Sequence, residues 1–311
     1  MPQVPGSSAT FVTGINDSNI IAGYYTTPAT PDDRRHGFFG TLNGQYTTFD
    51  YAPEGDTVPQ AIGSDGRITG WWRKNSNAVT DVQFIRNADG MIQRITLNGR
   101  RLKGAGKPAA LLSTGEFVGE YEAERKTTGY FKRPKGYAGT GADYISEIVL
   151  PFRKVYGTYP AGLNAMGHIV GSFSPCDVCA FVGFLMKDGT AHKIVFPDSF
   201  EDGTSLAAIN DAGVAVGSYN QYVNGENAPV AFLYDSATDS FQQLPGAHAL
   251  AINNSGIIAL NTSSGPQVYC TSTTGCPRAG GAVTVEDRWA AASPENDQAT
   301  VCTRHCREPV R

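Results

Sequence analysis

The sequence predicts an all-β fold, a six-bladed β-propeller of four-stranded antiparallel blades with an irregular, Cys-containing C-terminal tail. The first observation is a short pattern that recurs at spacings of 47, 49, 52, 46 and 42 residues. The second is composition, because the chain has 36 Gly and only 17% charged residues, against roughly 25% in an average soluble domain. A period of about 40 to 50 residues with four short strands per copy is typical of propeller blades.

The clearest copy of the pattern spans residues 207–219, and each of its parts predicts an element. Residues 207–209 predict a short apolar strand, and residues 210–213 a tight turn with a positive-φ glycine. A second strand follows, in which Gly217 stands where a side chain would block a neighbouring backbone. Residues 231–233 and 241–244 predict the third and fourth strands.

The other copies share three landmarks with this one. The glycine of the second strand recurs at Gly23, Gly70, Gly119, Gly171 and Gly217, with Ala259 in the sixth copy. Two residues later an aromatic residue recurs: Tyr25, Trp72, Tyr121, Phe173 and Tyr219. The third strands fall at residues 37–39, 83–85, 129–131, 183–185, 231–233 and 267–269. This alignment predicts one propeller domain over residues 1–289, with blades at 9–55, 56–104, 105–156, 157–202, 203–245 and 246–289, and a tail at 290–311.

The last blade is the least regular part of the pattern. Residues 282–287 are candidates for its outer strand, and residues 1–8 or the tail are candidates for closing the ring. Either solution would remove the exposed edge that an open propeller leaves.

The pattern resembles a known repeat family. Gly-Ile-Asn-Asp at residues 14–17, Ile-x-Gly-Tyr at 21–24 and His-Gly-Phe at 36–38 are similar to the HAF-type repeats of bacterial extracellular proteins. The resemblance covers roughly residues 9–270 and implies a propeller-like, secreted or periplasmic protein whose leader is absent from this chain. It implies no catalytic residues.

Candidate functional residues lie where the copies differ. In a propeller the loops before the first strands and those between second and third strands are expected to surround one mouth of the central channel. In a catalytic version of this site, Lys107 and Arg73 would neutralise a substrate carboxylate, and Tyr159 and His248 would act as base and acid. The expected ligand-binding residues are Tyr24, Asp56, Trp71, Trp72, Glu122 and Thr204. The alternative is a water-filled polar pore without a substrate.

The recurring aromatic rings have two interpretations. They could be platforms on which sugars stack, or they could fill the space between adjacent blades, where each ring buries about 150 to 250 Å². Trp71 and Tyr24 precede the column residues Trp72 and Tyr25 and should face the opposite way, so they are expected to be more exposed.

The charge and the motifs of the sequence limit the classes of molecule that the protein is expected to bind. The net charge of −4 argues against nucleic acid, although residues 94–154 contain 12 Lys or Arg against 6 Asp or Glu and suggest an anionic ligand. No apolar run approaches the roughly 20 residues of a membrane-spanning helix. No cofactor or metal motif occurs; calcium at the Asn/Asp-rich turns stays open, but none of these turns has the EF-hand spacing.

Six cysteines form three close pairs, Cys176 with Cys179, Cys270 with Cys276, and Cys302 with Cys306. Short-range pairs in even number suit disulfides in an oxidising compartment. The alternative is a zinc site built from Cys176, Cys179, Cys302, His305 and Cys306.

Two functions follow from these observations. The first is an exported, non-catalytic binding or scaffold propeller that holds a polar small molecule, a saccharide or an anion, at the channel mouth. The second is a lyase or hydrolase that acts on an acidic polysaccharide with Tyr159 and His248 at the same mouth.

Overall fold

The computed structural model describes residues 3–270, apart from residues 19, 29–33, 42–43, 75–81, 98–99, 103–105, 113, 124–132, 142–143 and 263–264. Within this part the fold is all-β, with one 3-10 helix, η1 (Phe200–Asp202). None of the helices in the described part has the length and apolarity needed to cross a bilayer. The structure confirms the predicted all-β class and the four-stranded antiparallel sheets, five of which lie in the described part.

Five described sheets have four strands each, in sequence order. They are β1 (Ala9–Ile15), β2 (Ile20–Thr26), β3 (His36–Thr41) and β4 (Tyr46–Phe49); β5 (Asp56–Ile62), β6 (Ile68–Arg73), β7 (Val82–Arg86) and β8 (Ile92–Arg94); β11 (Pro108–Leu111), β12 (Phe117–Ala123), β13 (Arg133–Gly141) and β14 (Tyr144–Glu147); β15 (Gly157–Leu163), β16 (Ile169–Ser174), β17 (Val182–Lys187) and β18 (Thr190–Ile194); and β19 (Thr204–Ile209), β20 (Val214–Val223), β21 (Glu226–Asp235) and β22 (Ser240–Gln243).

Two smaller sheets complete the described strands. β9 (Thr96–Leu97) and β10 (Arg100–Arg101) form a short hairpin between the second and third four-stranded sheets. β23 (His248–Ile252), β24 (Ile257–Thr262) and β25 (Gly265–Cys270) form a three-stranded sheet at the end of the described chain. The expected outer strand at residues 282–287 and the tail at 290–311 lie outside the described residues.

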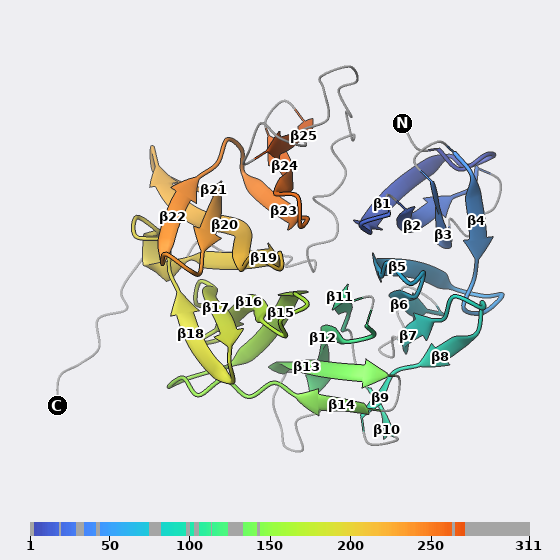
Figure 1. Cartoon of the computed structure of the whole chain (residues 1–311), viewed down its shortest axis with the longest axis horizontal. Helices are drawn as coiled ribbons and strands as arrows, with labels where there is room; N and C mark the ends of the chain where they lie inside the picture. The colour runs from blue at the N-terminus through green and yellow to red at the C-terminus, as the bar shows by residue number, and fades with distance from the viewer. Residues whose placement is uncertain are drawn as a thin grey trace.

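The sheets follow one another around a central axis, with the first strand of each nearest the centre (Figure 1). Consecutive sheets pack on each other, as β5 does on β2 and β19 does on β16. Among the described residues no strand of the last sheet pairs with the first sheet, so the ring is not closed by them. The N-terminal segment packs on its own sheet instead, where Val4 is buried with Ile21 and Phe38.

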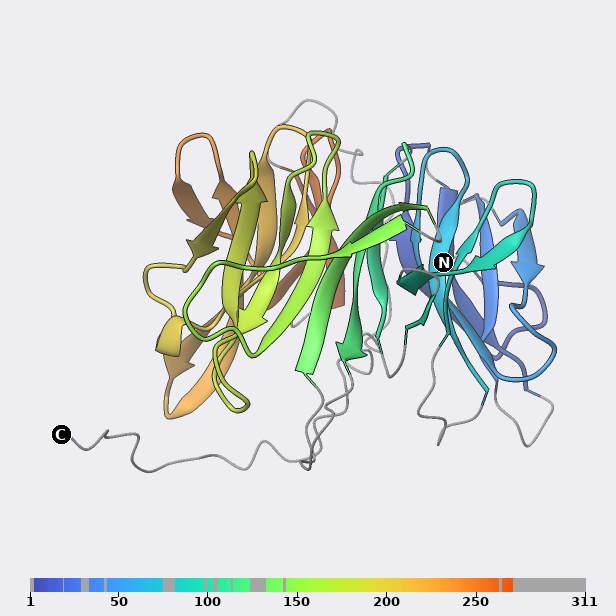
Figure 2. The same cartoon turned by 90° about the horizontal axis from the view of Figure 1, so that it is seen from below.

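The ring has two faces that differ in construction, and the strands run between them (Figure 2). On the face that we call the turn face, the first and second strands join in short turns, such as residues 210–213, where Gly213 has a φ of +80° as expected. On the other, the loop face, the second strand turns into the third. The loop face carries the connections expected to hold a binding site.

The recurring asparagine explains the regularity of the turn face. Asn164 Oδ1 accepts hydrogen bonds from the N–H groups of Met166 (3.1 Å) and His168 (2.9 Å), closing its own turn. Its Nδ2 donates to the carbonyl of Asn210 in the next sheet at 2.9 Å. In the first sheet, Asn16 Nδ2 likewise donates to Gly63 O at 3.0 Å. One side chain therefore both caps a turn and joins two sheets.

The recurring glycine has a steric role. A Cβ on Gly217 would overlap the carbonyl oxygen of Ser205 on the neighbouring first strand. The pairing of that strand shifts register between Leu206 and Ala208, which is a β-bulge opposite the glycine. Equivalent shifts occur in the other first strands, for example between Val12 and Gly14. The prediction of a close backbone approach at this position is confirmed.

The recurring aromatic residues mostly fill the space between sheets. Tyr121, Phe173 and Tyr219 are buried, and Tyr219 stacks on Phe196 with ring centroids 3.8 Å apart. The packing interpretation is therefore confirmed for these three rings. Trp71 was expected to be exposed, but it is only 4% exposed, because Arg73 on the same strand lies over its ring.

One disulfide, Cys176–Cys179, lies in the connection between β16 and β17. It confirms the first predicted pair and corrects the zinc alternative, because disulfide sulfurs cannot serve as thiolate ligands. In the described part of the chain, no three His, Cys, Asp or Glu side chains are grouped as metal ligands would be. The remaining cysteine pairs and His305 lie wholly or partly outside the described residues.

Candidate functional site

Five of the predicted site residues lie where the first and second sheets meet. The end of β2 supplies Tyr24, the start of β5 supplies Asp56, and the end of β6 supplies Trp71, Trp72 and Arg73. These strand ends lie on the loop face, because in every copy of the repeat the first strand begins there and the second strand ends there. We call Tyr24, Arg35, Asp56, Trp71 and Arg73 the junction cluster.

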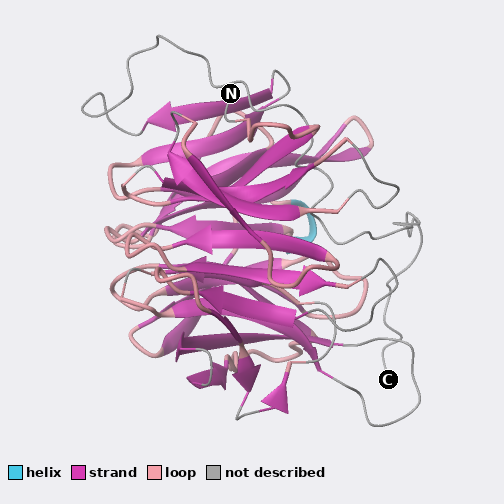
Figure 3. Cartoon of the chain, turned by 90° about the vertical axis from the view of Figure 1, so that its right-hand side faces the viewer, coloured by secondary structure: helices cyan, strands magenta, loops and turns pink. Residues whose placement is uncertain are grey.

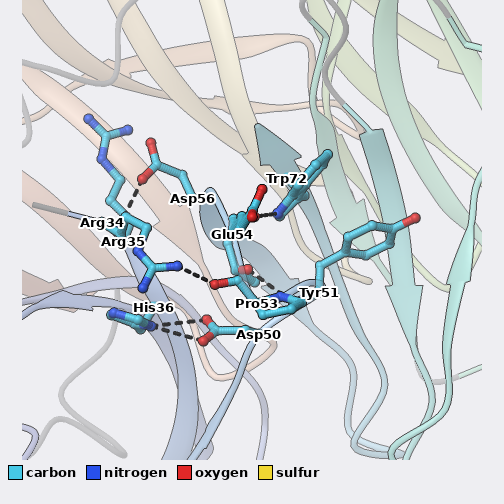
Figure 4. Close-up of polar contacts among 10 residues, drawn as sticks. Arg34, Arg35, His36, Asp50, Tyr51, Pro53, Glu54, Asp56 and Trp72 are labelled. Atoms are coloured by element: carbon cyan, nitrogen blue, oxygen red, sulfur yellow. Dashed lines mark hydrogen bonds and ion pairs between the residues drawn. The ribbon is translucent and has the colours of Figure 1, made fainter. Parts of the chain in front are cut away.

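Asp56 connects the two sheets in the junction cluster, and Figure 4 shows its contact with Arg35. Its Oδ1 accepts a hydrogen bond from the backbone N–H of Arg35 at 3.0 Å. The next residue, Thr57, donates its N–H to the carbonyl of Arg35 at 2.7 Å. In the pairing of β5 with β6, Asp56 is directly opposite Arg73. The carboxylate thus stands between the backbone of one sheet and a guanidinium-bearing strand of the next.

Each guanidinium of the junction cluster lies over an aromatic ring. Arg35 Cζ is 5.4 Å from the centroid of the Tyr24 ring, and Arg73 Cζ is 5.1 Å from that of Trp71. Burial raises the pKa of Tyr24; the Arg35 charge acts in the opposite direction and Asp56 adds to the rise. Tyr24 is therefore a neutral phenol at neutral pH and can donate a hydrogen bond.

The indole of Trp71 has a buried Nε1 without a hydrogen-bond partner among the described residues. A buried donor without an acceptor costs roughly 1 to 3 kcal/mol. Its ring is held below Arg73 on the same strand. Sequence reasoning identified Trp71 as a site residue but gave the wrong exposure, because alternation along the strand does not show what covers the ring.

A second set of polar contacts, made by His36, Asp50, Trp72 and Glu54, lies next to the junction cluster. His36 Nδ1 lies 2.9 Å from Asp50 Oδ2, and its ring stacks on Tyr25 at 5.2 Å. Trp72 Nε1 donates to Glu54 O at 2.8 Å. His36 belongs to the His-Gly-Phe motif of the repeat, and its contact with Asp50 was missed because 14 residues separate them.

Arg34 and Arg35 were also missed. Arg34 Nη1 donates to the carbonyl of Pro53 in the connection between β4 and β5. The signal in the sequence was the run Arg34-Arg35-His36 directly before the third strand. It carries three basic side chains into a loop-face connection, and the third sheet has Arg133 and Lys135 at the positions equivalent to Arg34 and His36.

The four predicted catalytic residues lie on four different sheets (Figure 1). Arg73 ends β6, Lys107 directly precedes β11, Tyr159 is in β15 and His248 begins β23. The sequence therefore predicted positions that recur around the ring, and the structure distributes them around the ring.

Tyr159 and His248 have local partners. The Tyr159 ring meets Phe181 edge-on at 5.1 Å, and burial, with a smaller effect of Glu120, raises its pKa. This disfavours the phenolate that a base would need. His248 Nδ1 lies 3.2 Å from Ser218 Oγ, and partial burial lowers its pKa, which keeps the imidazole neutral.

The other expected ligand residues are placed as follows. Thr204 is 1% exposed, and its Oγ1 accepts the backbone N–H of Phe196 at 3.0 Å, so its role is internal. Glu122 is in β12, and its side chain lies outside the described part. A hollow of about 440 Å³ between the first two sheets is lined by turn residues such as Asn16 and Ser64. It opens on the turn face and contains none of the predicted site residues.

No protein-family model and no curated protein sequence matches the chain. Similar solved structures include the acylaminoacyl peptidase of Pyrococcus horikoshii, with a TM-score of 0.54 and 12% identity over 86% of this chain and 46% of that one. Prolyl oligopeptidase B from Galerina marginata has a TM-score of 0.52 and 12% identity over 76% of this chain and 34% of that one. A third is the β-propeller domain of the Trilobed protease from Pyrococcus furiosus, described as having an open velcro topology, with a TM-score of 0.46 and 12% identity over 85% of this chain and 96% of that one.

The chain spans less than half the length of the first two proteins. At this identity the likeness shows the fold, which is propeller-like. The interpretation as a saccharide- or anion-binding propeller, and its polysaccharide lyase or hydrolase alternative, are wrong on this comparison, because the similar structures with TM-scores above 0.5 are named as peptidases.

Proposed function

We propose that this protein recognises peptides, and that an extended peptide segment binds at the junction cluster. The observation that carries the proposal is the position of Asp56 between two guanidinium–aromatic stacks, Arg35 on Tyr24 and Arg73 on Trp71. Every peptide unit offers one N–H donor and one C=O acceptor. The Asp56 carboxylate can accept a hydrogen bond from the N–H, and the guanidinium groups of Arg35 and Arg73 can donate hydrogen bonds to the C=O. The aromatic rings add apolar surface for side chains.

The propeller-like fold supports this proposal. Proteins with similar folds are named as peptidases, so peptides are the class of molecule they handle. Fold alone does not transfer an activity, which is why the proposal is placed on the junction cluster and can be tested there.

We further propose that the peptide site belongs to a six-bladed propeller. Six blades follow the boundaries 9–55, 56–104, 105–156, 157–202, 203–245 and 246–289, as HAF-type repeats would. The sixth blade gains its fourth strand from residues 282–287. An exported location is supported by the Cys176–Cys179 disulfide, since disulfides persist in oxidising compartments.

The test is binding to a library of unmodified peptides, followed by titration calorimetry with the best binder. Asp56→Asn and Arg35→Gln each remove one charged group, and we expect each to weaken binding by about 10- to 100-fold, the value of a charge-assisted hydrogen bond. Asp17→Asn is the matched control, because Asp17 is an exposed carboxylate at the turn-face end of the first sheet.

Trp71 gives an independent readout, because its indole lies under Arg73 and its emission should change when a peptide occupies the cluster. After incubation with the protein, the masses of the recovered peptides are measured by mass spectrometry, which detects cleavage. Equal affinities for wild type, Asp56→Asn and Arg35→Gln would exclude the junction cluster as the peptide site.

A further inference from the structure

The fourth and fifth sheets share a continuous piece of the loop face. It consists of the disulfide connection 175–181, the segment 197–203 that contains η1, and the β20–β21 hairpin at 220–228. Backbone hydrogen bonds join them, from Thr204 N to Phe181 O at 2.9 Å and from Asn220 N to Gly203 O at 2.7 Å. Figure 3 shows η1 on one side of the ring of strands.

Large apolar side chains are exposed on two of the three segments, the disulfide connection and the hairpin. Val178 is 90% exposed, Phe181 43%, Tyr222 55% and Val223 42%. Phe200 stacks on Tyr222 with ring centroids 4.9 Å apart, which connects the middle segment to the hairpin. Single exposed apolar residues are common, but a contiguous group of this kind marks an interaction surface.

The charge on the same segments has one sign. The exposed acidic side chains are Asp177, Asp198, Glu201 and Glu226. The three segments contain no Lys, Arg or His. We call these apolar and acidic residues the acidic docking surface.

We propose that the acidic docking surface binds a basic segment of a partner protein, in which Lys or Arg residues alternate with apolar or aromatic ones. The apolar side chains would supply most of the affinity, and the carboxylates would select basic partners and speed their association. The Cys176–Cys179 disulfide restrains the connection that presents Val178, which lowers the entropy lost on binding. This surface lies on the fourth and fifth sheets, so it is independent of the peptide site proposed on the first and second.

The probe is a fluorescent peptide of alternating Lys and Leu or Phe residues, and its matched control carries Glu in place of Lys. We expect Tyr222→Ser and Val178→Ser each to weaken binding of the basic peptide roughly tenfold. Met166→Ser is the control for lost apolar area, since Met166 is 68% exposed on the turn face of the fourth sheet. Thermal unfolding of each variant verifies that it is folded.

Charge is tested separately. Asp177→Asn with Glu201→Gln should weaken binding and flatten its dependence on salt between about 50 and 300 mM, where surface charges become screened. Asp188→Asn, in the turn between β17 and β18, is the charge control. The proposal is overturned if the Glu-containing peptide binds equally well, or if all of these variants bind the basic peptide as wild type does. Binding of anionic vesicles in place of the peptide would also contradict it.

Discussion

At the scale of single residues, Asn164 shows how one repeated side chain stabilises this fold. It is 1% exposed and contributes hydrogen bonds to its own turn and to the next sheet. Asn164→Ala leaves two backbone N–H groups and one carbonyl without this partner, so we expect the free energy of unfolding to fall by about 2 kcal/mol. Urea unfolding measures it. Asn227→Ala, at an exposed hairpin position, should leave the midpoint unchanged.

His248 gives a prediction for pH. Its pKa in the folded state is lowered by burial, so the unfolded chain takes up the proton first as the pH falls through about 6.5. Stability is therefore present above that pH and decreases below it. The melting temperature of wild type should fall more between pH 7.5 and 5.5 than that of His248→Gln. Parallel curves for the two proteins would show that His248 does not contribute.

The residue scale is also where the sequence was least informative. The repeated asparagines and glycines could be predicted, because turn chemistry and close backbone approach depend on local sequence. The environments of Trp71 and Thr204 could not be predicted. An arginine two residues away covers the Trp71 ring, and Thr204 accepts the backbone N–H of Phe196 from the connection before its strand.

At the scale of elements, the disulfide connection between β16 and β17 allows a quantitative test. Cys176 and Cys179 enclose a very short loop, so the chain-entropy contribution of this disulfide is about 2 kcal/mol. We expect the double variant Cys176→Ser, Cys179→Ser to lose that much unfolding free energy, and reductant to have the same effect on wild type. If reductant destabilises the double variant equally, another disulfide is responsible.

Strand order could be predicted from the landmarks, because each copy repeats the same alternation. The third copy was aligned wrongly: its third strand was predicted at residues 129–131, which lie outside the described residues, whereas Tyr137 in β13 is the residue opposite Gly119. The bulges opposite the recurring glycines could not be placed residue by residue, since register depends on packing against the next sheet. The same limit applies to the junction cluster, where Asp56 was identified but its partner Arg35, 21 residues earlier, was not.

At the scale of the whole molecule, the sequence predicted the class of fold but not its closure. Repeat spacing reports how each copy resembles the next, and it contains no information about which segment completes the last copy. In the described residues the N-terminal segment is committed to the first sheet through Val4, so it does not supply a strand to β23–β25.

The seam between the first and last sheets has a mechanical consequence. Among the described residues, the extensive contacts of each sheet are with the sheets next to it in sequence. An assembly of this kind behaves as a linear stack, in which cooperativity passes from one unit to the next. Fraying should begin beside the seam and reach the disulfide-bearing middle last. Hydrogen exchange would then rank the sheets by their distance from the seam, and the two ends of the chain would be the first to lose protection.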